Sequence, residues 1–401
     1  EVATTMVLLI GAGLMIRSFY RLENVNPGFS YENLTSFTVS LPQKKYTAEE
    51  QRSQFFNRLL ENLRTQPGVQ SVGAASGLPL GNNGWQTSFI VDGRPKPPPG
   101  DTPLMEACTV TQDYFHAMNI PLLRGRYFTN HDDRSFIGGK DLSQMNDGER
   151  ILAGTNVIII DEEFARRYWP NEEAVGKRIR FGSDAKAPLL EVVGVVGRVK
   201  MEGLDTDSNR VQGYFSYSQV PFWAMTVVVK GYGDPNQLIA SARNQIKALD
   251  PDQPLYNIRT MDEIRGESVA PQRLNLTLLS IFAGIAFLLA IVGIYGVMSY
   301  AVTQRTHEIG IRMAIGAQPR DVFKMILGQG MMLTLIGMAA GLLGAFALTR
   351  LMTSMLFTVK PTDPITFTTV GLLLLLIALI ACYIPGRRAT KVDPVNSLRY
   401  E

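Results

Sequence analysis

Three long apolar runs in the second half of the chain constrain its fold more than any other feature. They extend from Leu274 to Tyr300, from Met325 to Leu348 and from Phe367 to Ile384. Each reaches the roughly 18 to 20 residues that a helix needs to cross about 30 Å of hydrocarbon. Only 19% of all residues are charged, which is also typical of a membrane protein. We therefore expect three transmembrane helices, at about 274–300, 325–348 and 367–384.

A fourth apolar run, Val2 to Ile16, is about 15 residues long and falls short of that criterion. The sequence begins at Glu1 and not at a methionine, so we expect residues 1–21 to be a first transmembrane helix truncated on its N-terminal side. A cleaved signal peptide is the alternative. Arg17 and Arg21 follow the run and no basic segment precedes it, which disfavours that alternative.

Lys and Arg residues predict the orientation of these helices, because cytoplasmic loops carry an excess of both. The segment between the second and third spans and the C-terminal tail are rich in them, so both are predicted to be cytoplasmic. The region between Arg17 and Arg273 is then external, in the periplasm of a Gram-negative cell. Arg17 and Arg21 oppose this orientation, but long domains translocate largely regardless of charge. The cations counted are Arg305, Arg312, Arg320, Lys324, Arg387, Arg388, Lys391 and Arg399 inside, against Arg350 and Lys360 outside.

The external region, residues 22–270, contains the pattern of a βαβ unit. A strand at Leu34 to Leu41 is followed by a capping box of Thr47 with Glu50, which predicts the start of a helix. The helix ends at Pro67-Gly68, and Val69 to Ser76 can return as a strand. Its expected buried residues are Phe37, Val39 and Leu41 on the strand and Phe55, Phe56, Leu59, Leu60 and Leu63 on the helix.

A second unit of the same kind follows far downstream. It comprises a strand at Ala224 to Lys230, a helix at Gln237 to Leu249 and a strand at Leu255 to Ile258. Two such halves predict a split ferredoxin-like α/β fold with a subdomain inserted at about 80–218. The segments Arg94 to Gly100 and Asn130 to Arg150 are expected to be loops of the insertion.

No catalytic or metal-binding constellation is evident, and we expect no enzyme activity, cofactor or metal. Asp161-Glu162-Glu163 opens a predicted helix, where acidic residues interact favourably with the helix dipole. Asp132-Asp133 and Asp205-Asp207 are interpreted as solvated surface. The two cysteines, Cys108 and Cys382, lie in different regions and predict no disulfide. The scattered histidines His116, His131 and His307 are expected on the surface.

Two further absences exclude functional classes. No G-x-x-x-x-G-K-[ST] motif occurs, since Gly139-Lys140 and Gly176-Lys177 lack the earlier glycine, so the chain has no P-loop for ATP. The interiors of the three complete spans contain no Asp, Glu, Lys, Arg or His, which disfavours a secondary transporter driven by ions or protons. A net charge of +3 without basic tracts argues against a nucleic-acid partner.

The stretch QRTHEIGIRMAIGAQPRDVFKMIL, Gln304 to Leu327, lies between two predicted spans. Glu308 and Arg312 stand four residues apart with the acid first, and Arg305 precedes Glu308 by three, so a helix would bring them together. Pro319 is suited to the first position of the next helix. By these residues alone, an amphipathic connector on the membrane surface is an equal alternative to a docking element.

Small residues recur along the predicted spans at intervals that permit close helix packing in lipid. Such packing would occur within one chain or between two chains. The candidate residues are Gly293 and Gly296 in the second span, and Gly337, Gly341 and Gly344 in the third.

The stretch Arg305 to Ala317 resembles the R-x-x-E-I-G-I-R-x-A-I-G-A segment of the MacB/FtsX-like family of ABC transporter permeases. FARRYWPNEEAVGKRI and EVVGVVGRVKMEGL, between residues 157 and 204, resemble the MacB-like periplasmic core domain of that family. PTDPITF and RRATKVDPVNSLRYE resemble the tail of large permeases that contain two such cassettes, so this chain is interpreted as the C-terminal cassette of one.

The resemblance implies an inner-membrane, multi-pass permease with a large periplasmic domain at 22–270 and an FtsX-like permease domain at 271–401. Its coupling helix, 304–318, would dock on a separate cytoplasmic ABC ATPase and pass ATP-driven motion to the periplasmic domain for efflux of a small molecule, peptide or lipid-linked cargo. Further implied partners are a second copy or second permease cassette and a periplasmic adaptor. The coupling residues implied are Arg305, Glu308, Ile309, Gly310, Arg312, Ala314 and Gly316.

One alternative belongs to another functional class. FtsX-like proteins also make credible a membrane-anchored scaffold that binds and regulates a periplasmic partner, such as a cell-wall hydrolase, without transporting anything. Capture of an ATPase by the full-length chain would distinguish the two.

Overall fold

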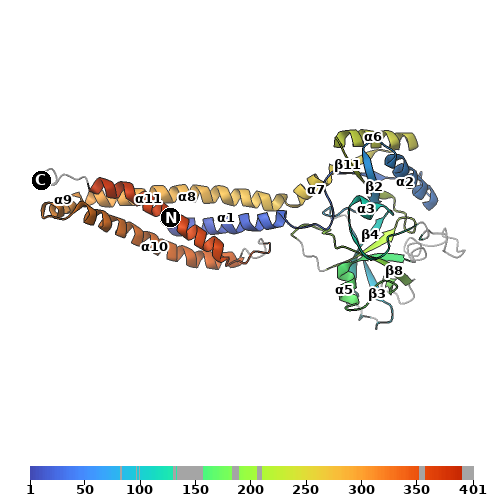
Figure 1. The fold of residues 1–401 in the computed structure, drawn as a ribbon, viewed down its shortest axis with the longest axis horizontal. Helices are drawn as coiled ribbons and strands as arrows, with labels where there is room; N and C mark the ends of the chain where they lie inside the picture. The colour runs from blue at the N-terminus through green and yellow to red at the C-terminus, as the bar shows by residue number, and fades with distance from the viewer. Residues whose placement is uncertain are drawn as a thin grey trace. The chain divides into compact units, whose positions relative to one another are not determined.

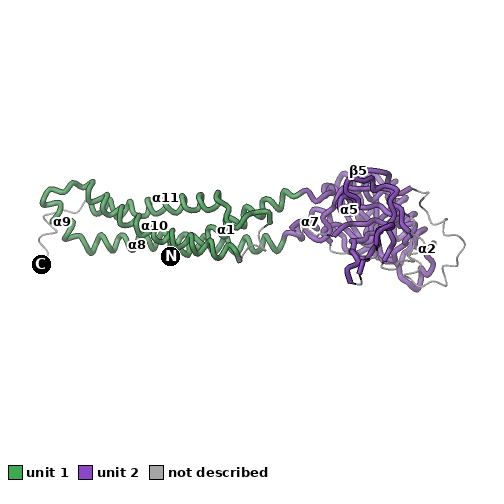
Figure 2. The backbone as a smooth tube through the Cα atoms, turned by 90° about the horizontal axis from the view of Figure 1, so that it is seen from below, with its two compact units in different colours: residues 1–25, 270–401 green, residues 26–269 purple. Residues whose placement is uncertain are grey.

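A computed structural model describes residues 1–81, 84–95, 97–98, 100–129, 132, 157–182, 189–205, 210–351 and 357–390. The chain forms two compact units, which Figure 2 colours separately. Unit 1 comprises residues 1–25 and 270–401, and unit 2 comprises residues 26–269. The predicted loop at Asn130 to Arg150 lies outside the described residues except for Asp132, and so do His131 and Asp207.

Unit 2 contains the predicted split βαβ arrangement. The first half is β1 (Leu34–Ser40), α2 (Glu49–Arg64) and β2 (Val69–Ala75), and the second is β10 (Ala224–Gly231), α6 (Pro235–Leu249) and β11 (Leu255–Thr260). These strands lie in the order β11-β1-β10-β2, and each neighbouring pair is antiparallel. Because β10 separates β1 from β2, the two halves interlock, as a ferredoxin-like fold requires.

The core of this sheet contains the residues that the sequence periodicity predicts. Phe37 and Val39 of β1 are buried against Phe56, Leu59 and Leu63 of α2. Helices α2 and α6 lie side by side over the strands (Figure 1). The alternation along β1 and the three-to-four-residue spacing along α2 therefore place one apolar face of each element in a common core.

The predicted N-terminus of α2 is wrong by one residue. The N-cap is Ala48 and not Thr47, and the backbone N–H of Ala48 donates to Oε1 of Gln51 at 3.3 Å. Alanine has no side-chain oxygen to cap the helix. Glu49 and Glu50 lie in its first turn, where they favour the start of the helix through its dipole.

The inserted elements extend the same sheet to eleven strands. The junction is β2 with β4, where Ala75 pairs with Val110. A second core lies among the inserted elements and includes Phe89, Phe164 and Trp169. The inserted elements are β3 (Trp85–Val91), β4 (Leu104–Val110), α3 (Tyr114–Ala117), β5 (Leu122–Gly125), β6 (Val157–Asp161), α5 (Glu162–Tyr168), β7 (Arg178–Phe181), β8 (Leu189–Val196) and β9 (Val211–Ser216).

The interpretation of Asp132 as solvated surface is wrong. Its side chain is buried and accepts hydrogen bonds from Nη1 and Nη2 of Arg126 at 2.7 and 2.8 Å. Burial by itself would raise the pKa of Asp132, but the hydrogen bonds from Arg126 and Thr129 outweigh it and hold the pKa below its ordinary value. His116 and Asp205 are exposed, as predicted.

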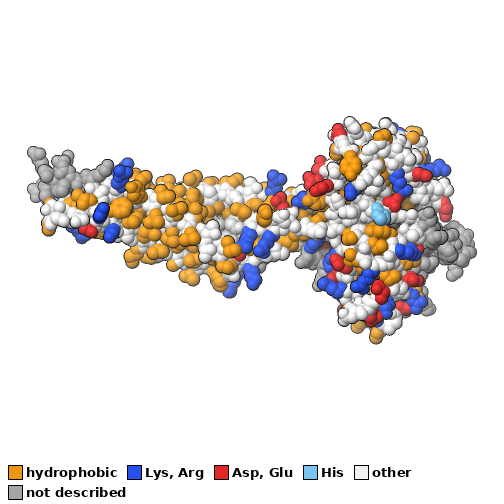
Figure 3. All heavy atoms as spheres, in the orientation of Figure 1, with side chains coloured by type: hydrophobic (Ala, Val, Ile, Leu, Met, Phe, Trp, Pro, Cys, Tyr) orange, Lys and Arg blue, Asp and Glu red, His pale blue; other side chains and the backbone are white. Residues whose placement is uncertain are grey.

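Unit 1 is a bundle of helices whose outer surface is largely apolar (Figure 3). Within its described residues, four helices are long and apolar enough to cross a membrane. They are α1 (Val2–Glu23), α8 (Ala270–Gln304), α10 (Pro319–Leu351) and α11 (Pro364–Ala389), with the short α9 (Thr306–Ala314) between α8 and α10. Unit 2 ends with α7 (Met261–Ser268), directly before α8.

The arginines that oppose the predicted orientation have partners in unit 1. Arg17 forms an ion pair with Asp363, and Arg21 donates to the carbonyl of Thr358. Asp363 also caps α11 by accepting from the backbone N–H of Thr366 at 3.0 Å. One end of α1 is thus fastened to the segment between α10 and α11, so these two charges have a structural role besides any influence on topology.

Candidate functional site

The predicted coupling residues lie on or beside α9, which connects α8 to α10 through very short links. Only Arg305 separates α8 from α9, and α10 begins at Pro319 with Asp321 in its first turn. The backbone N–H of Gln318 donates to Oδ2 of Asp321 at 3.3 Å. The chain therefore passes from α8 to α10 within residues 305–318, most of which belong to α9, and this leaves α9 little freedom to move independently of α8 and α10.

One face of α9 is directed into the bundle. Ile309 is buried against Val322 and Ile326 of α10 and Met298 of α8. The next residue, Gly310, is buried as well. These two predicted docking residues are therefore inaccessible from outside unit 1, and they join α9 to its neighbouring helices.

The exposed part of α9 carries a pair of charges beside the buried Ile309. Nη2 of Arg312 donates to Oε1 of Glu308 at 2.6 Å, and both side chains are about half exposed. Ile315, just beyond the helix, is 82% exposed, and Ala314 is exposed too. Together these residues form an exposed surface that is apolar at one end and charged at the other.

Arg305 does not complete the predicted cluster with Glu308. Its Nη1 donates instead to Oε1 of Gln329 on α10, at 3.2 Å. The reason is its conformation, since Arg305 is the residue before α9 and its backbone is not helical. Arg305 therefore links the start of α9 to α10, and Arg312, besides its pair with Glu308, donates through Nη1 to Sδ of Met325 on α10 at 3.1 Å.

Gly316 ends this element. Its φ is +104°, a conformation that side chains with a Cβ rarely adopt. The turn lets the N–H of Ala317 donate to the carbonyl of Arg312 at 2.9 Å, as in a glycine-terminated helix. Gly316 is exposed, and its contribution to the site is the direction in which the chain leaves α9.

The glycines predicted to permit helix packing have different surroundings. A Cβ at Gly337, Gly341 or Gly344 would lie 2.9, 2.9 or 3.3 Å from α1, so these three residues let α1 and α10 approach closely. Gly293 faces the side chain of Glu1. A Cβ at Gly296 would meet nothing within 4 Å among the described residues.

A closer approach, at Gly330, was not predicted. A Cβ there would lie 2.4 Å from Sγ of Cys382 on α11 and 3.1 Å from Sδ of Met298 on α8. Gly330 therefore lies where three helices meet, next to the residues that bury Ile309. Gly330 is not three or four residues from Gly337, so the intervals used in the sequence analysis did not include it.

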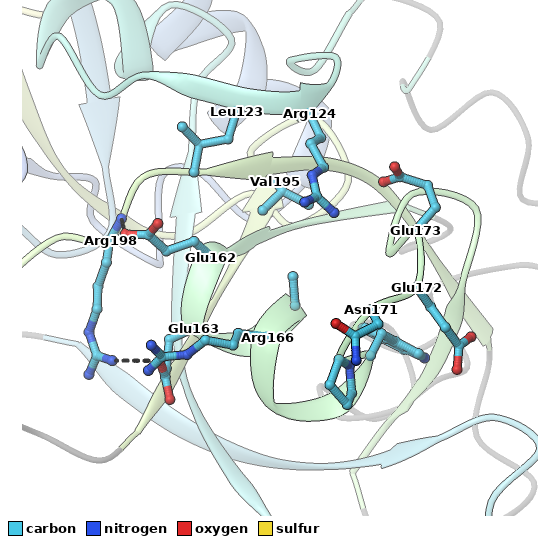
Figure 4. Close-up of a pocket in the computed structure, with 13 residues that line it drawn as sticks. Leu123, Arg124, Glu162, Glu163, Arg166, Asn171, Glu172, Glu173, Val195 and Arg198 are labelled. Atoms are coloured by element: carbon cyan, nitrogen blue, oxygen red, sulfur yellow. Dashed lines mark hydrogen bonds and ion pairs between the residues drawn. The ribbon is translucent and has the colours of Figure 1, made fainter.

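Unit 2 contains a wide cleft of about 1100 Å³, lined by both charged and apolar side chains and shown in Figure 4. Leu123 and Arg124 of β5 lie on one side of it, and α5 with the segment after it lies on the other (Figure 4). Glu163 is surrounded by arginines, with Nη2 of Arg167 at 3.0 Å and Nη1 of Arg198 at 3.7 Å from its carboxylate. The cleft thus carries mutually neutralising charges.

The acidic residues at the start of α5 have the predicted structural role. Oδ1 of Asp161 accepts from the backbone N–H of Phe164 at 2.9 Å and from that of Gln212 at 3.1 Å. Burial raises the pKa of Asp161 to about 6, and these hydrogen bonds oppose the rise. The cap and the ion pairs of Glu163 explain this acidic cluster without a catalytic function.

A second buried carboxyl, Glu106 on β4, is also unusual. Burial and the neighbouring Glu202 raise its pKa to about 7, while Arg210, 3.6 Å away, opposes the rise. Among the described residues, no group of three or more His, Cys, Asp or Glu side chains could hold a metal ion. Glu106 is therefore best described as a buried carboxyl of the sheet whose ionised form is disfavoured by its surroundings.

Two protein-family profiles match the chain. The MacB-like periplasmic core domain matches residues 2–249, and the C-terminal domain of FtsX-like permeases matches residues 280–394. The first match spans more than half of the chain, and the second includes α9 and most of the apolar helices. Together they include almost every element described above.

Curated relatives agree with the profiles. The macrolide export ATP-binding/permease protein MacB of Escherichia coli is 26% identical over 310 residues, which cover 73% of this chain and 43% of that protein. The pyoverdine export ATP-binding/permease protein PvdT of Pseudomonas putida is 25% identical, covering 71% of this chain and 41% of PvdT. The chain spans less than half the length of these two relatives. The uncharacterized ABC transporter permease YknZ of Bacillus subtilis is 23% identical, covering 73% of this chain and 69% of YknZ.

Solved structures show a weaker similarity. The periplasmic region of MacB from Actinobacillus actinomycetemcomitans has a TM-score of 0.37 and 16% identity, covering 62% of this chain and 97% of that structure. The extracellular domain of YknZ has a TM-score of 0.33 and 14% identity, covering 56% and 100%. Because these TM-scores are low, the family assignment depends on the two profiles.

Proposed function

Because the chain belongs to the family of ABC transporter permeases with a MacB-like periplasmic core domain and an FtsX-like permease domain, we propose that it couples a separate ATPase to its external unit. In this proposal unit 1 spans the inner membrane with α9 in the cytoplasm, and unit 2 lies in the periplasm. The ATPase supplies the motion, and unit 2 takes part in the export of a cargo.

The observation that carries the proposal is the two-sided character of α9. Its buried side, Ile309 and Gly310, joins it to the ends of α8 and α10. Its exposed side offers Glu308, Arg312 and Ile315 to a partner. A force applied to such a helix would pass into two long apolar helices, because only Arg305 separates α9 from α8 and only residues 315–318 separate it from α10.

The geometry narrows the proposed docking surface. Arg305, Ile309 and Gly310 are occupied within unit 1, and Gly316 sets the direction of the chain. The residues left for contact with the ATPase are Glu308, Arg312, Ala314 and Ile315. The exposed charge pair would provide specificity and orientation more than affinity, as charges at the rim of an interface usually do.

Export is supported by the functions in the names of the relatives, which carry macrolides and a pyoverdine. The cargo of this chain would be a small molecule, peptide or lipid-linked compound. A second copy or a second permease cassette would complete the transporter, and a periplasmic adaptor would bind unit 2.

Co-expression with an ABC ATPase encoded beside the gene tests the coupling role. Wild-type protein in detergent should retain the ATPase through purification, and Ile315→Asp or a Glu308→Arg, Arg312→Glu exchange should weaken that retention at least about tenfold. Gln304→Asp is the matched control, because Gln304 is exposed at the end of α8, beyond the apolar run and outside the proposed surface.

Two results would overturn the proposal. Equal retention of the ATPase by the wild type and the α9 variants would remove α9 from the interface. Labelling of a cysteine introduced at Ile315 only from the periplasmic side would reverse the topology on which the mechanism depends.

A further inference from the structure

An apolar groove of about 380 Å³ lies between α8 and α11 in unit 1. Ile291, Val292 and Tyr295 line it from α8, and Ile377, Ile380 and Ile384 line it from α11. Val292 is 67% exposed and Ile380 is 60% exposed, so the groove opens on the surface of the bundle. A cavity of this size matches the lower range of small-molecule sites.

A cation lies at one end of this groove. Arg388 follows Ile377, Ile380 and Ile384 on α11 at intervals of three or four residues, so all four share one helix face. Its Nη1 donates to the hydroxyl of Tyr295, which itself lines the groove, at 3.3 Å. Arg388 is exposed, and within the described ranges its side chain forms no ion pair.

We propose that this groove binds one anionic phospholipid, whose acyl chain lies along the aliphatic residues and whose phosphate contacts Arg388 and the hydroxyl of Tyr295. The two ends of the site match the two ends of such a lipid. Basic residues between helices at the cytoplasmic surface bind anionic headgroups, and tyrosine favours the same interfacial depth.

A soluble ligand fits these observations less well. The groove opens toward the surface that the apolar side chains of α8 and α11 would present to lipid, and its one polar lining group lies at the end near Arg388. Free phosphate would use Arg388 but leave the aliphatic residues empty. The proposal depends on the placement of unit 1 in a membrane, and it does not depend on the ATPase.

Native mass spectrometry of the full chain in detergent, with added palmitoyl-oleoyl phosphatidylglycerol, tests the site. We expect one saturable lipid adduct on the wild type. Arg388→Gln should weaken lipid binding about fivefold or more, the effect expected for losing one cation near a lipid headgroup. Ile380→Trp, whose larger side chain fills the groove, should weaken lipid binding by a similar factor.

Two variants serve as matched controls. Arg387→Gln removes the same charge from the last turn of α11 but leaves the contact between Arg388 and Tyr295 in place, and Leu376→Trp enlarges an apolar residue that is 55% exposed elsewhere on α11. Both should bind phosphatidylglycerol as the wild type does. Loss in Arg387→Gln equal to that in Arg388→Gln would mean that general surface charge attracts the lipid, and would overturn the proposal.

Two further measurements distinguish a bound lipid from free phosphate and from a second copy of the chain. Inorganic phosphate at millimolar concentration should not displace the lipid, and displacement would assign the site to free phosphate. If a second copy of the chain covered the groove, the wild type would show no adduct, and Ile380→Trp would instead break a dimer. Wild-type ATPase capture with no lipid adduct would reject the groove while leaving the proposed function intact.

Discussion

Phe164 in unit 2 and Leu343 in unit 1 are both large apolar side chains, yet Phe164 is fully buried and Leu343 is 75% exposed. In unit 2 the sheet and helices bury apolar faces against each other, so the hydrophobic effect drives their packing. In unit 1 the outer surface is as apolar as the interior, and close contacts at small residues must specify how the helices fit.

The two units also differ in where their charged side chains lie. Unit 2 buries carboxyl groups such as Asp161 and Glu106 within its sheet, and the fold raises the pKa of each. In unit 1 the middle of each long helix carries no charge, and the pairs Arg17–Asp363 and Glu308–Arg312 lie near helix ends. The comparison shows that unit 2 tolerates electrostatic strain that the interior of unit 1 avoids.

The largest expected effect concerns apolar side chains, which are buried in the core of unit 2 and exposed on the surface of unit 1. Phe164→Ala should destabilise unit 2 by about 3–5 kcal/mol, because it leaves a cavity in a close-packed core. Leu343→Ala, at a position facing outward, should change the stability of unit 1 by less than about 0.5 kcal/mol. All three tryptophans, Trp85, Trp169 and Trp223, lie in unit 2, so their fluorescence during urea unfolding measures the first variant. The rate at which a thiol reagent labels Cys382, which is buried in unit 1, measures the second. A comparable loss of stability in both variants would erase the contrast.

A moderate effect tests the role of small residues in unit 1. A side chain at Gly341 would lie 2.9 Å from the carbonyl oxygen of Ala3, so Gly341→Leu should cost roughly 1–3 kcal/mol through overpacking. Gly296→Leu is the matched control, because its Cβ meets open space. The rate at which a thiol reagent labels Cys382, which is buried in unit 1, measures the opening of the bundle. Equal labelling rates in the two variants would show that α1 and α10 do not depend on the glycine.

The smallest effect concerns the buried carboxyl of unit 2. The folded pKa of Glu106 is about 7, against an ordinary value of 4.5, so the folded state binds more protons than the unfolded state between these pH values. The stability of unit 2 should therefore fall as pH rises from about 4.5 to 7. Glu106→Gln should flatten this dependence and add about 1 kcal/mol at pH 8.

Thermal unfolding of unit 2, followed by tryptophan fluorescence at pH 5 and pH 8, measures this effect. Glu61→Gln, at an exposed position of α2, should behave like the wild type at both pH values. An unchanged pH dependence in Glu106→Gln would assign the strain to another group, such as Asp161.

The sequence predicts the elements whose signals are local. The alternation of Phe37, Val39 and Leu41 and the spacing of Phe55 to Leu63 determine which faces are buried, and both are confirmed. The long apolar runs likewise coincide with helices. In each case neighbouring residues along the chain carry the whole signal.

The wrong predictions concern features that depend on residues distant in the sequence or on the conformation of the backbone. Asp132 is buried because Arg126 and the core around it form a partner that a charge pattern does not show. Thr47 is displaced as the N-cap by Ala48, since Gln51 supplies the hydrogen bond. Within the candidate site, the family resemblance implied that Ile309 belongs to the docking surface, whereas Ile309 is buried against α8 and α10.

The pairing of β1 with β11 has a consequence for how this protein could have evolved. The chain enters the sheet of unit 2 through β1 and leaves it through β11, and these two strands are hydrogen-bonded neighbours. Adjacent entry and exit points are the geometry that tolerates insertion of one folded module into another. Recombination between related permeases could therefore replace the whole of unit 2 by a single insertion and leave the helices of unit 1 unchanged.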